Sequence, residues 1–435
     1  MIGSRRLILA ALAAGAVVRA LALPLPGTPD VGSWKIWTFA GAGDPTALYG
    51  VGGSPPERRQ LDWHGLKGTT EYPPFALYQM GAVGAIYQRI DPTYTDSWQL
   101  TALVKTPGLL AEIGFVVALL TWGRRRFGDG AVWAALAFWV NPAIILNGAV
   151  LGYLDAQMAV PAALALLAAS AGQPGLAGAL AAVAVLTKAQ AVFVLPFAAL
   201  LALNAADGWR SRALGRFLAG GAIASAVLIL PIVLRGATAN MFQAIGRLGA
   251  HDMLSGNAMN VWWIITWALR AAFALDAGWW AAASIRMRIL GVTRFREIGY
   301  PNPKPIGAAI VIATSAWALW RVRRSASPAL VALAATWATY AYTMFNVQVH
   351  ENHLYLAVPV AAIAAGLDGR FRSIFYGISA ITAVNMYMFY GFGEGWPPVI
   401  NHRWTGIDLT VLLAMANVAY FVWVTRRFVS ASGRS

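Results

Sequence analysis

Long apolar runs recur from one end of the chain to the other, separated by short polar segments. A helix needs roughly 20 apolar residues to cross the hydrocarbon core of a bilayer, and many of these runs approach that length. The candidate spans lie near 7–23, 98–122, 131–148, 154–171, 175–188, 190–204, 213–234, 306–322, 328–346, 354–367, 371–391 and 406–425. Two weaker runs fall within 260–290. We therefore expect an all-α polytopic membrane protein with about 12–14 transmembrane helices.

Composition supports the same class. Of the 435 residues, 58% are apolar and 12% are charged, whereas a soluble domain has about 25% charged residues. These values exclude a soluble fold and a disordered chain. The chain has no cysteine, which excludes disulfides and thiolate chemistry. The absence of Asn-x-Ser/Thr sites, together with short loops, favours a bacterial cell membrane over the endoplasmic reticulum.

Basic residues predict the orientation, because short cytoplasmic loops are enriched in Lys and Arg. Six groups of arginines fall on one side if residues 24–97 form a single external loop, with a helix at 74–90 lying in the membrane interface. These groups are Arg5 and Arg6, Arg124 to Arg126, Arg210 with Arg212 and Arg216, Arg321 with Arg323 and Arg324, Arg370 with Arg372, and Arg426 with Arg427. Both termini are then cytoplasmic, in one membrane domain over 1–435 whose 235–305 region is external or re-entrant.

The external loop 24–97 carries the first candidate catalytic group. Asp30 follows the first span directly and precedes an amphipathic stretch that places Trp34 and Trp37 on one face. Aromatic surroundings remove water from a carboxylate and raise its pKa, which makes it a better base. A plain helix N-cap is the structural alternative for Asp30. Later in the loop, two prolines present Glu71 and Tyr72 at the start of the next helix, or simply stiffen this junction.

Ionisable residues inside spans are functional candidates, because an unpaired charge in lipid costs at least ~2.5–3.5 kcal/mol. Lys105 and Glu112 lie seven residues apart on one helix face, and Asp155 begins another span. Lys188, followed by Gln190, marks the junction of two short helices. Structural ion pairs are the alternative reading for Glu112 and Asp155, whereas the position of Lys188 favours a functional role.

A polar tract between two spans, 346–353, contains His350 and Glu351. Its histidines are three residues apart, unlike the i, i+4 pair of a helical zinc site, so we expect no metal. An imidazolium there is suited to binding phosphate. Further basic residues crowd the outer face against the positive-inside trend, among them Arg286 and Arg288. Lipid carriers with phosphate heads explain this excess, and ordinary anionic headgroups are the alternative.

Six tracts in order resemble the GT-C superfamily of integral-membrane glycosyltransferases, most closely the dolichyl-phosphate-glucose-dependent glucosyltransferases. The tracts are Asp30 in the first loop, Glu71-Tyr-Pro-Pro, Gly152-Tyr-Leu-Asp155-Ala-Gln157, Lys188-Ala-Gln190, Ala258-Met-Asn260-Val-Trp262 and Val349-His350-Glu351-Asn352. The family has Asp where this chain has Glu71, and Lys where it has Asn352. These departures leave the sugar and the acceptor open.

The resemblance implies an inverting transferase that moves a hexose from a polyprenyl-phosphate-linked donor to an acceptor hydroxyl on the non-cytoplasmic face, without a cofactor. It implies that Asp30 is the general base and that the donor phosphate is bound by Lys105, Lys188, His350, Arg286 and Arg288. The substrate pocket would comprise Trp34, Trp37, Glu71, Tyr72, Asp155, Gln190, Asn260 and Glu351. The partners would be the donor, a glycan or lipid-linked acceptor and membrane lipids, with no nucleic acid. A transporter or flippase for a lipid-linked or anionic substrate is the alternative from another class.

Overall fold

The computed structural model describes residues 5–50, 61–204, 210–247, 253–273, 303–400 and 408–433. Helices make up almost all of this part of the chain, and its only strands form two short two-stranded pairings. The all-α class predicted from the sequence is therefore confirmed. Arg286 and Arg288 lie outside the described residues, as does most of the weak pair of runs at 260–290.

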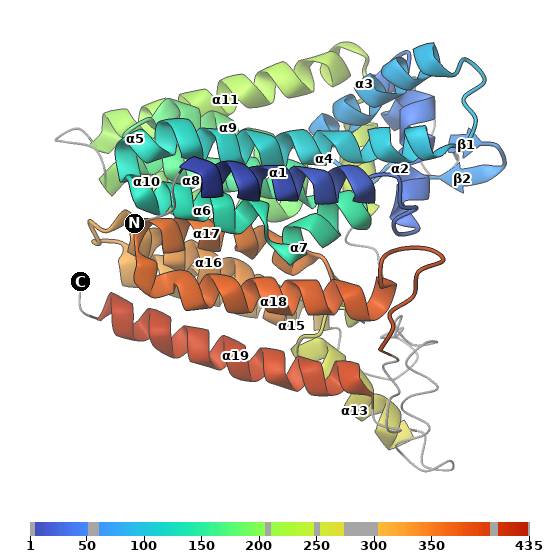
Figure 1. Cartoon of the computed structure of the whole chain (residues 1–435). Coiled ribbons are helices and arrows are strands. Elements are labelled where there is room, and N and C mark those ends of the chain that lie inside the picture. The colour runs from blue at the N-terminus through green and yellow to red at the C-terminus, as the bar shows by residue number, and fades with distance from the viewer. Residues whose placement is uncertain are drawn as a thin grey trace.

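The main helices form one bundle and run along a common direction, with both chain termini at the same end (Figure 1). They are α1 (Arg5–Ala22), α4 (Trp98–Ala118), α6 (Asp129–Trp139), α8 (Asp155–Ser170), α9 (Pro174–Val185), α10 (Leu195–Asn204), α11 (Arg210–Leu234), α15 (Pro303–Val322), α16 (Pro328–Phe345), α17 (Ala357–Leu367), α18 (Arg372–Tyr390) and α19 (Leu409–Ser432). Shorter pieces are η3 (Leu119–Gly123), α5 (Arg124–Phe127), α7 (Pro142–Ile145), η4 (Leu146–Val150), η5 (Ala189–Phe193), α12 (Thr238–Gly246), α13 (Val261–Phe273), η8 (His353–Leu356) and η9 (Gly369–Phe371).

The centre of the bundle consists of α8, α16 and α17, whose surfaces are buried nearly all round. Alanine dominates all three helices, and small side chains let helix backbones approach closely. At the periphery, α11 exposes a row of apolar side chains, including Leu218, Ile223 and Val227. A helix that is apolar on its outer face is suited to lipid contact. The bundle is thus apolar both inside and out, as the composition requires.

The number of full-length spans is smaller than the 12–14 predicted. By length and composition, four helical segments of the described chain are long and apolar enough to cross a membrane: Trp98–Phe127, Ser211–Leu234, Pro303–Val322 and Leu409–Ser432. A bent pair, Asp129–Trp139 with Pro142–Val150, makes a fifth if it counts as one span. Four other apolar helices have only 10–17 residues. Because central helices are enclosed by others, they do not need to match the bilayer thickness.

Two runs predicted as single or paired spans are interrupted at recognisable residues. The run 131–148 bends by 48° at Asn141, whose side-chain oxygen accepts from the amide of Ala143 at 2.9 Å and so starts a new helix. Between α9 and α10 the chain passes through η5, with Lys188 immediately before it. The predicted junction of two short helices at Lys188 is therefore confirmed.

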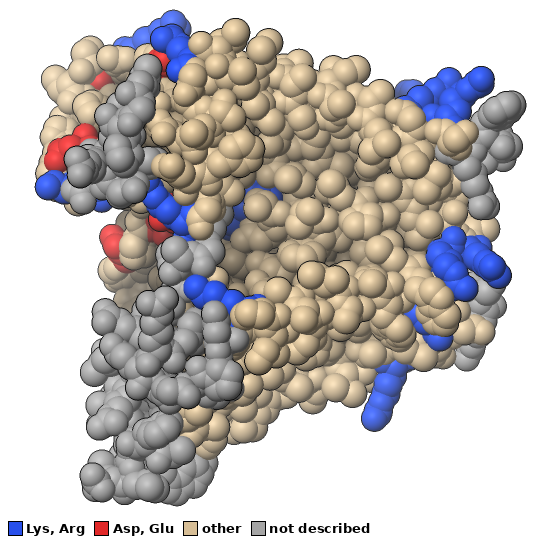
Figure 2. Space-filling model, turned by 180° about the vertical axis from the view of Figure 1, so that it is seen from behind, with Lys and Arg blue, Asp and Glu red and all other residues tan. Residues whose placement is uncertain are grey.

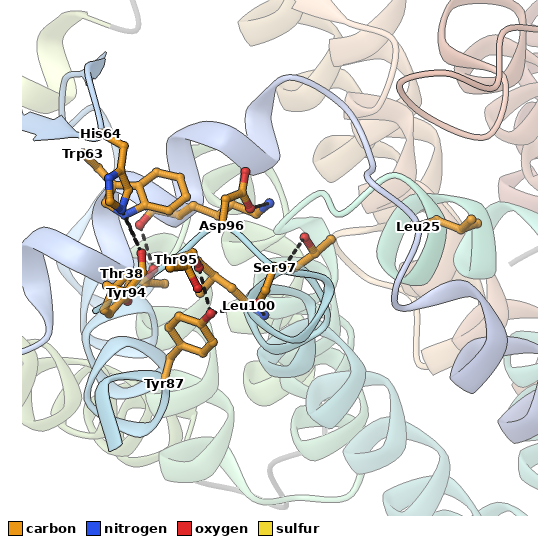
Figure 3. Close-up of polar contacts among 12 residues, drawn as sticks. Leu25, Thr38, Trp63, His64, Tyr87, Tyr94, Thr95, Asp96, Ser97 and Leu100 are labelled. Carbon is orange, nitrogen blue, oxygen red and sulfur yellow. Dashed lines mark hydrogen bonds and ion pairs between the residues drawn. The ribbon is translucent and has the colours of Figure 1, made fainter. Parts of the chain in front are cut away.

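The loop 24–97 folds into a separate layer at one end of the bundle. Its elements are α2 (Asp30–Gly41), η1 (Pro45–Tyr49), the hairpin strands β1 (Leu61–Trp63) and β2 (Leu66–Gly68), and α3 (Pro74–Ile90). Figure 3 shows how Trp63 and His64 of the hairpin both reach the carbonyl of Tyr94 at 3.1 Å, while the Tyr87 hydroxyl donates to the carbonyl of Thr95 at 2.8 Å. These bonds fasten the hairpin and the segment before α4 to the helices of the layer.

Charge divides the two ends of the bundle. On the face in Figure 2, Lys and Arg gather without Asp or Glu at the end that carries the termini, and both signs occur at the opposite end. The band between them is nearly free of charge. At the basic end, the Arg321 guanidinium donates to the Ser432 hydroxyl near the C-terminus, and Arg372 lies 4.6 Å from the ring of Trp133. The structure is therefore that of a membrane protein with one strongly basic end.

Candidate active site

A cavity of about 740 Å³ is lined in part by residues of α2, a helix that lies at the end of the bundle opposite the termini (Figure 1). Its walls come from the start of α2, the segment 67–72, the Lys188 junction with η5, α16 with the tract that follows it as far as His353, and the end of α18. The predicted site residues that line it are Asp30, Trp34, Trp37, Glu71, Tyr72, Lys188, Gln190, His350 and Glu351. The fold thus brings together residues that lie more than 300 positions apart in the sequence.

Asp30 is the first residue of α2 and is exposed to the cavity. The turn before it is tied to the bundle, because the amide of Thr28 donates to the carbonyl of Leu151 at 3.0 Å. On its other side, the carbonyl of Gly27 accepts from the amide of Glu394 at 2.7 Å. Gly27 has φ +82°, and a Cβ there would lie 2.7 Å from the Leu151 oxygen, so only glycine fits. The turn that precedes Asp30 is therefore anchored by backbone bonds to two other segments, which fixes the start of α2.

Burial raises the pKa of the Asp30 carboxyl above its usual range. The positive charge of Lys188 lowers this pKa, whereas the negative charges of Asp155 and Glu71 raise it. A carboxylate whose pKa is raised while it stays open to a cavity is a stronger base than one in bulk water. The environment of Asp30 therefore has the properties that the sequence analysis predicted for a base.

Three aromatic side chains form the wall beside Asp30. The ring of Trp34 lies 4.7 Å from that of Trp37, and both lie 5.4 Å from Tyr72 between ring centres. The Trp34 indole donates to the carbonyl of Gly152 at 2.9 Å, and the Trp37 indole donates to the carbonyl of Thr69 at 3.1 Å. Both tryptophans are almost completely buried. Because both indole N–H groups are hydrogen-bonded to backbone, the rings present an apolar surface in a fixed position.

Lys188 lies next to this aromatic wall, with its ammonium 5.5 Å from the ring centre of Tyr72. Its Nζ donates to Oδ1 of Asp155 at 2.6 Å. Oδ2 of Asp155 accepts from the side-chain amides of Asn147 at 2.9 Å and Asn352 at 2.8 Å. Lys188 is therefore a buried cation with a counter-ion, and it is one of the residues that line the cavity.

The tract between α16 and η8 supplies His350 and Glu351. Strand β4 (Val349–His350) pairs in parallel with β3 (Ser255–Gly256), and a Cβ on Gly256 would lie 2.7 Å from Nδ1 of His350. The imidazole therefore packs directly over that glycine. Glu351 is buried and accepts a hydrogen bond from the hydroxyl of Tyr153. Burial raises the pKa of Glu351 to about 8.

Gln190 reaches the last part of the same wall. Its Nε2 lies 2.9 Å from Nε2 of His353, and the Tyr342 hydroxyl lies 3.2 Å from Nδ1 of that ring. Among the described residues, no group of three or more His, Cys, Asp or Glu is arranged to hold a metal ion. Gln190, His353 and Tyr342 thus form a connected chain of polar contacts in this wall.

Three predicted site residues lie away from the cavity surface. The Lys105 ammonium donates to the carbonyls of Leu25, Ala149 and Val150 at 2.6, 3.0 and 2.9 Å. Asp155 lies behind the wall, as described above. Asn260 donates to the carbonyl of Thr343 at 2.8 Å and is completely buried. Arg286 and Arg288 are outside the described residues.

The cavity also contains residues that the sequence analysis did not assign. These are Ser33, Lys67, Gly68, Thr69, Ala189, Val192, Phe193, Tyr342, Asn346, Val347, Gln348, Asn352, His353 and Tyr390. Asn352 and His353 belong to the polar tract singled out in the sequence, so their position next to Glu351 was a usable signal. Tyr390 ends a long apolar run, and nothing in its local sequence marks it. Only the packing of α18 against the bundle brings it to the cavity.

No protein-family model matches the chain, and no curated protein matches it. Among solved structures, it is similar to an oligosaccharyltransferase of Archaeoglobus fulgidus, determined with a tethered acceptor peptide that contains the NVT sequon. The identity is 14% and the TM-score is 0.43. The match covers 99% of this chain and 55% of the other, so the chain spans about half the length of that enzyme.

Proposed function

We propose that this protein is a membrane glycosyltransferase of the GT-C type, which moves a hexose from a polyprenyl-phosphate-linked donor to an acceptor hydroxyl with inversion. The observation that carries the proposal is the position of Asp30. A carboxylate with a raised pKa opens onto a sheltered cavity, and Lys188 and His350 reach the same cavity from other segments. A base and groups suited to a leaving phosphate are the two requirements of such a transfer.

Each group has a role in the proposed reaction. Asp30 takes the proton of the acceptor hydroxyl as its oxygen bonds to the anomeric carbon, and the bond from that carbon to the phosphate oxygen breaks. His350 and Lys188, which both line the cavity, stabilise the negative charge on the departing phosphate. For Arg286 and Arg288, the proposal that they bind the donor phosphate rests on the sequence alone.

The remaining cavity residues shape the substrate pocket. Trp34, Trp37 and Tyr72 supply an apolar wall, and Glu71 and Gln190 supply hydrogen bonds. Glu351, whose pKa is raised by burial, lines the pocket as a further hydrogen-bonding group. All three N–H donors of the Lys105 ammonium are taken by backbone carbonyls. We therefore propose that Lys105 does not bind phosphate and instead connects the segment before Asp30 to the end of η4.

The reaction is proposed for the non-cytoplasmic side, in a bacterial cell membrane. The support is the distribution of charge, because short basic segments gather at the end opposite the cavity and such segments face the cytoplasm. Transport was the other function considered, and its main support was charge inside the spans. Glu112 is instead paired with Arg19 at 2.7 Å, and Lys105 is satisfied by backbone. These charges have structural partners and need no transported substrate.

The test uses purified protein in detergent, incubated with a polyprenyl-phosphate-hexose donor and a panel of glycan acceptors. Transfer releases free polyprenyl phosphate and yields a glycoside of inverted configuration, both of which mass spectrometry and NMR detect. The same protein in sealed vesicles provides the comparison for transport. Movement of intact donor across the vesicle membrane with no free polyprenyl phosphate would contradict the proposal and establish transport.

A further inference from the structure

Asp155 is the most completely bonded carboxylate among the described residues that surround the cavity. It is 1% exposed and does not line the cavity, although two of its donors, Lys188 and Asn352, do. Its third donor, Asn147, comes from η4. One buried group therefore joins three segments of the chain, at positions 147, 188 and 352.

The geometry leaves Asp155 no free direction toward a substrate. Oδ1 accepts from Lys188, and Oδ2 accepts from both asparagine amides. A buried carboxylate is tolerated only when its charge is compensated and its oxygens are hydrogen-bonded. Asp155 is also the first residue of α8, where the helix dipole favours a negative charge. Both its charge and its lone pairs are thus used within the protein.

We infer that Asp155 is a positioning residue: it does not touch substrate, and from behind the wall it fixes Lys188 and Asn352 relative to each other. Without it, Lys188 is a buried cation with no counter-ion, and the 346–353 tract loses one of its anchors to the bundle. Both cavity walls then move independently. The consequence for catalysis rests on the proposed function, whereas the consequence for wall position does not.

The absence of cysteine from the chain permits a direct test with single reporter thiols. Ala189→Cys reports on the Lys188 junction and Gln348→Cys on the tract, while Ser33→Cys on α2 reports on the far wall. Each is placed in the otherwise unchanged protein and in the Asp155→Asn variant, and its rate of labelling by a small thiol reagent is measured. Glu112→Gln is the matched control, since Glu112 is equally buried in another ion pair away from the cavity.

Asp155→Asn is expected to raise labelling at positions 189 and 348 about tenfold, which corresponds to about 1.4 kcal/mol of lost local stability. Labelling at Ser33→Cys should not change, and Glu112→Gln should change none of the three. If the enzyme transfers sugar, Asp155→Asn should lower kcat more than it changes the KM for the donor, because Lys188 acts on the leaving phosphate. Glu112→Gln should leave both constants near wild type.

Three results would overturn the inference. Unchanged labelling at both reporters would show that Asp155 holds neither wall, and equal acceleration by Glu112→Gln would show only general loosening. An Asp155→Cys thiol labelled as fast as the cavity reporters would show that position 155 faces substrate. The labelling experiment does not depend on catalysis. A failure to detect sugar transfer would therefore count against the proposed function, while the labelling rates would still test the role of Asp155.

Discussion

A base in a membrane enzyme must be sheltered from bulk water and still reach its substrate. Asp30 meets both conditions, since the turn before it is anchored to the bundle while its carboxylate opens to the cavity. Its neighbours act on it in opposite directions. Lys188 stabilises the charged form, and Glu71 and Asp155 destabilise it. The balance among these residues, as well as burial, determines the pH range in which Asp30 is a base.

This balance predicts how activity depends on pH. A base works only when deprotonated, so transfer is lost as pH falls through the pKa of Asp30, and the raised pKa places this acid limb above pH 3.8. Glu71→Gln removes a negative neighbour and should move the limb of kcat/KM to lower pH. Lys188→Met removes a positive neighbour and should move it to higher pH. If activity falls at the same acidic pH in the wild type and in both variants, Asp30 is not the base.

The ion pair of Arg19 and Glu112 makes a separate prediction about stability. Both side chains are 1% exposed, and Arg19 also donates to the carbonyl of Trp139 at 2.8 Å. Glu112→Leu leaves a buried unpaired guanidinium and should destabilise the protein by about 3–5 kcal/mol. The double variant Arg19→Met/Glu112→Leu should recover most of this loss. Thermal unfolding in detergent measures both, and a double variant no more stable than the single one would contradict the pairing.

Close contact between α2 and α3 fixes the layer that carries Asp30. A Cβ on Gly84 of α3 would lie 2.0 Å from the carbonyl oxygen of Thr38 in α2, so the two helices touch through backbone. Helix pairs approach this closely only where a side chain is absent. The position of Asp30 relative to the cavity therefore depends on a glycine more than 50 residues away.

Gly84→Ala should force these helices apart, lower the melting temperature and reduce sugar transfer. Gly32→Ala on α2 is the matched control, because a Cβ there meets no atom within 4 Å. Alanine is also the better helix former by about 1 kcal/mol, so this control should be neutral or slightly stabilising. Thermal unfolding and transfer rates compare the two, and equal behaviour of both variants would contradict the close packing.

At the level of elements, the sequence predicted helix positions better than helix continuity. The helix at 74–90 was predicted with its observed bounds, because Pro73 and Pro74 mark its start. The run at 131–148 was predicted as one span, although Asn141 and Pro142 are a recognisable cap and first helical residue. Helices shorter than a bilayer were counted as spans because hydropathy records apolar character and not whether neighbours enclose the helix.

The whole molecule has one basic end and one end with mixed charge, which predicts its orientation in the membrane. Leu66→Cys in the β1–β2 hairpin should react with a membrane-impermeant thiol reagent on intact cells. Ser211→Cys at the start of α11 should react only after the membrane is permeabilised. Since the chain has no other cysteine, the labelling is unambiguous. The reverse pattern would place the cavity in the cytoplasm and contradict the proposed side of the reaction.

Nine of the residues that line the cavity were predicted as candidates, because charged and aromatic polar groups stand out in an apolar chain. What the sequence does not contain is their pairing. Tyr153 bonds to Glu351 across 198 residues, and Asp155 bonds to Asn352 across 197. Such contacts depend on how the bundle packs. Lys105 was predicted to bind phosphate for the same reason: its charge is visible in the sequence, but the three carbonyls that accept its protons are not.

The central claim is that Asp30 is the base of a sugar transfer in this cavity. Its most direct test is the rate at which purified protein releases free polyprenyl phosphate from a polyprenyl-phosphate-hexose donor in the presence of acceptor. Asp30→Asn should reduce this rate by about 10²–10⁴-fold with little change in melting temperature. The matched Asp62→Asn, at an exposed hairpin residue that does not itself line the cavity, should keep it. Release by Asp30→Asn at the wild-type rate would contradict the account.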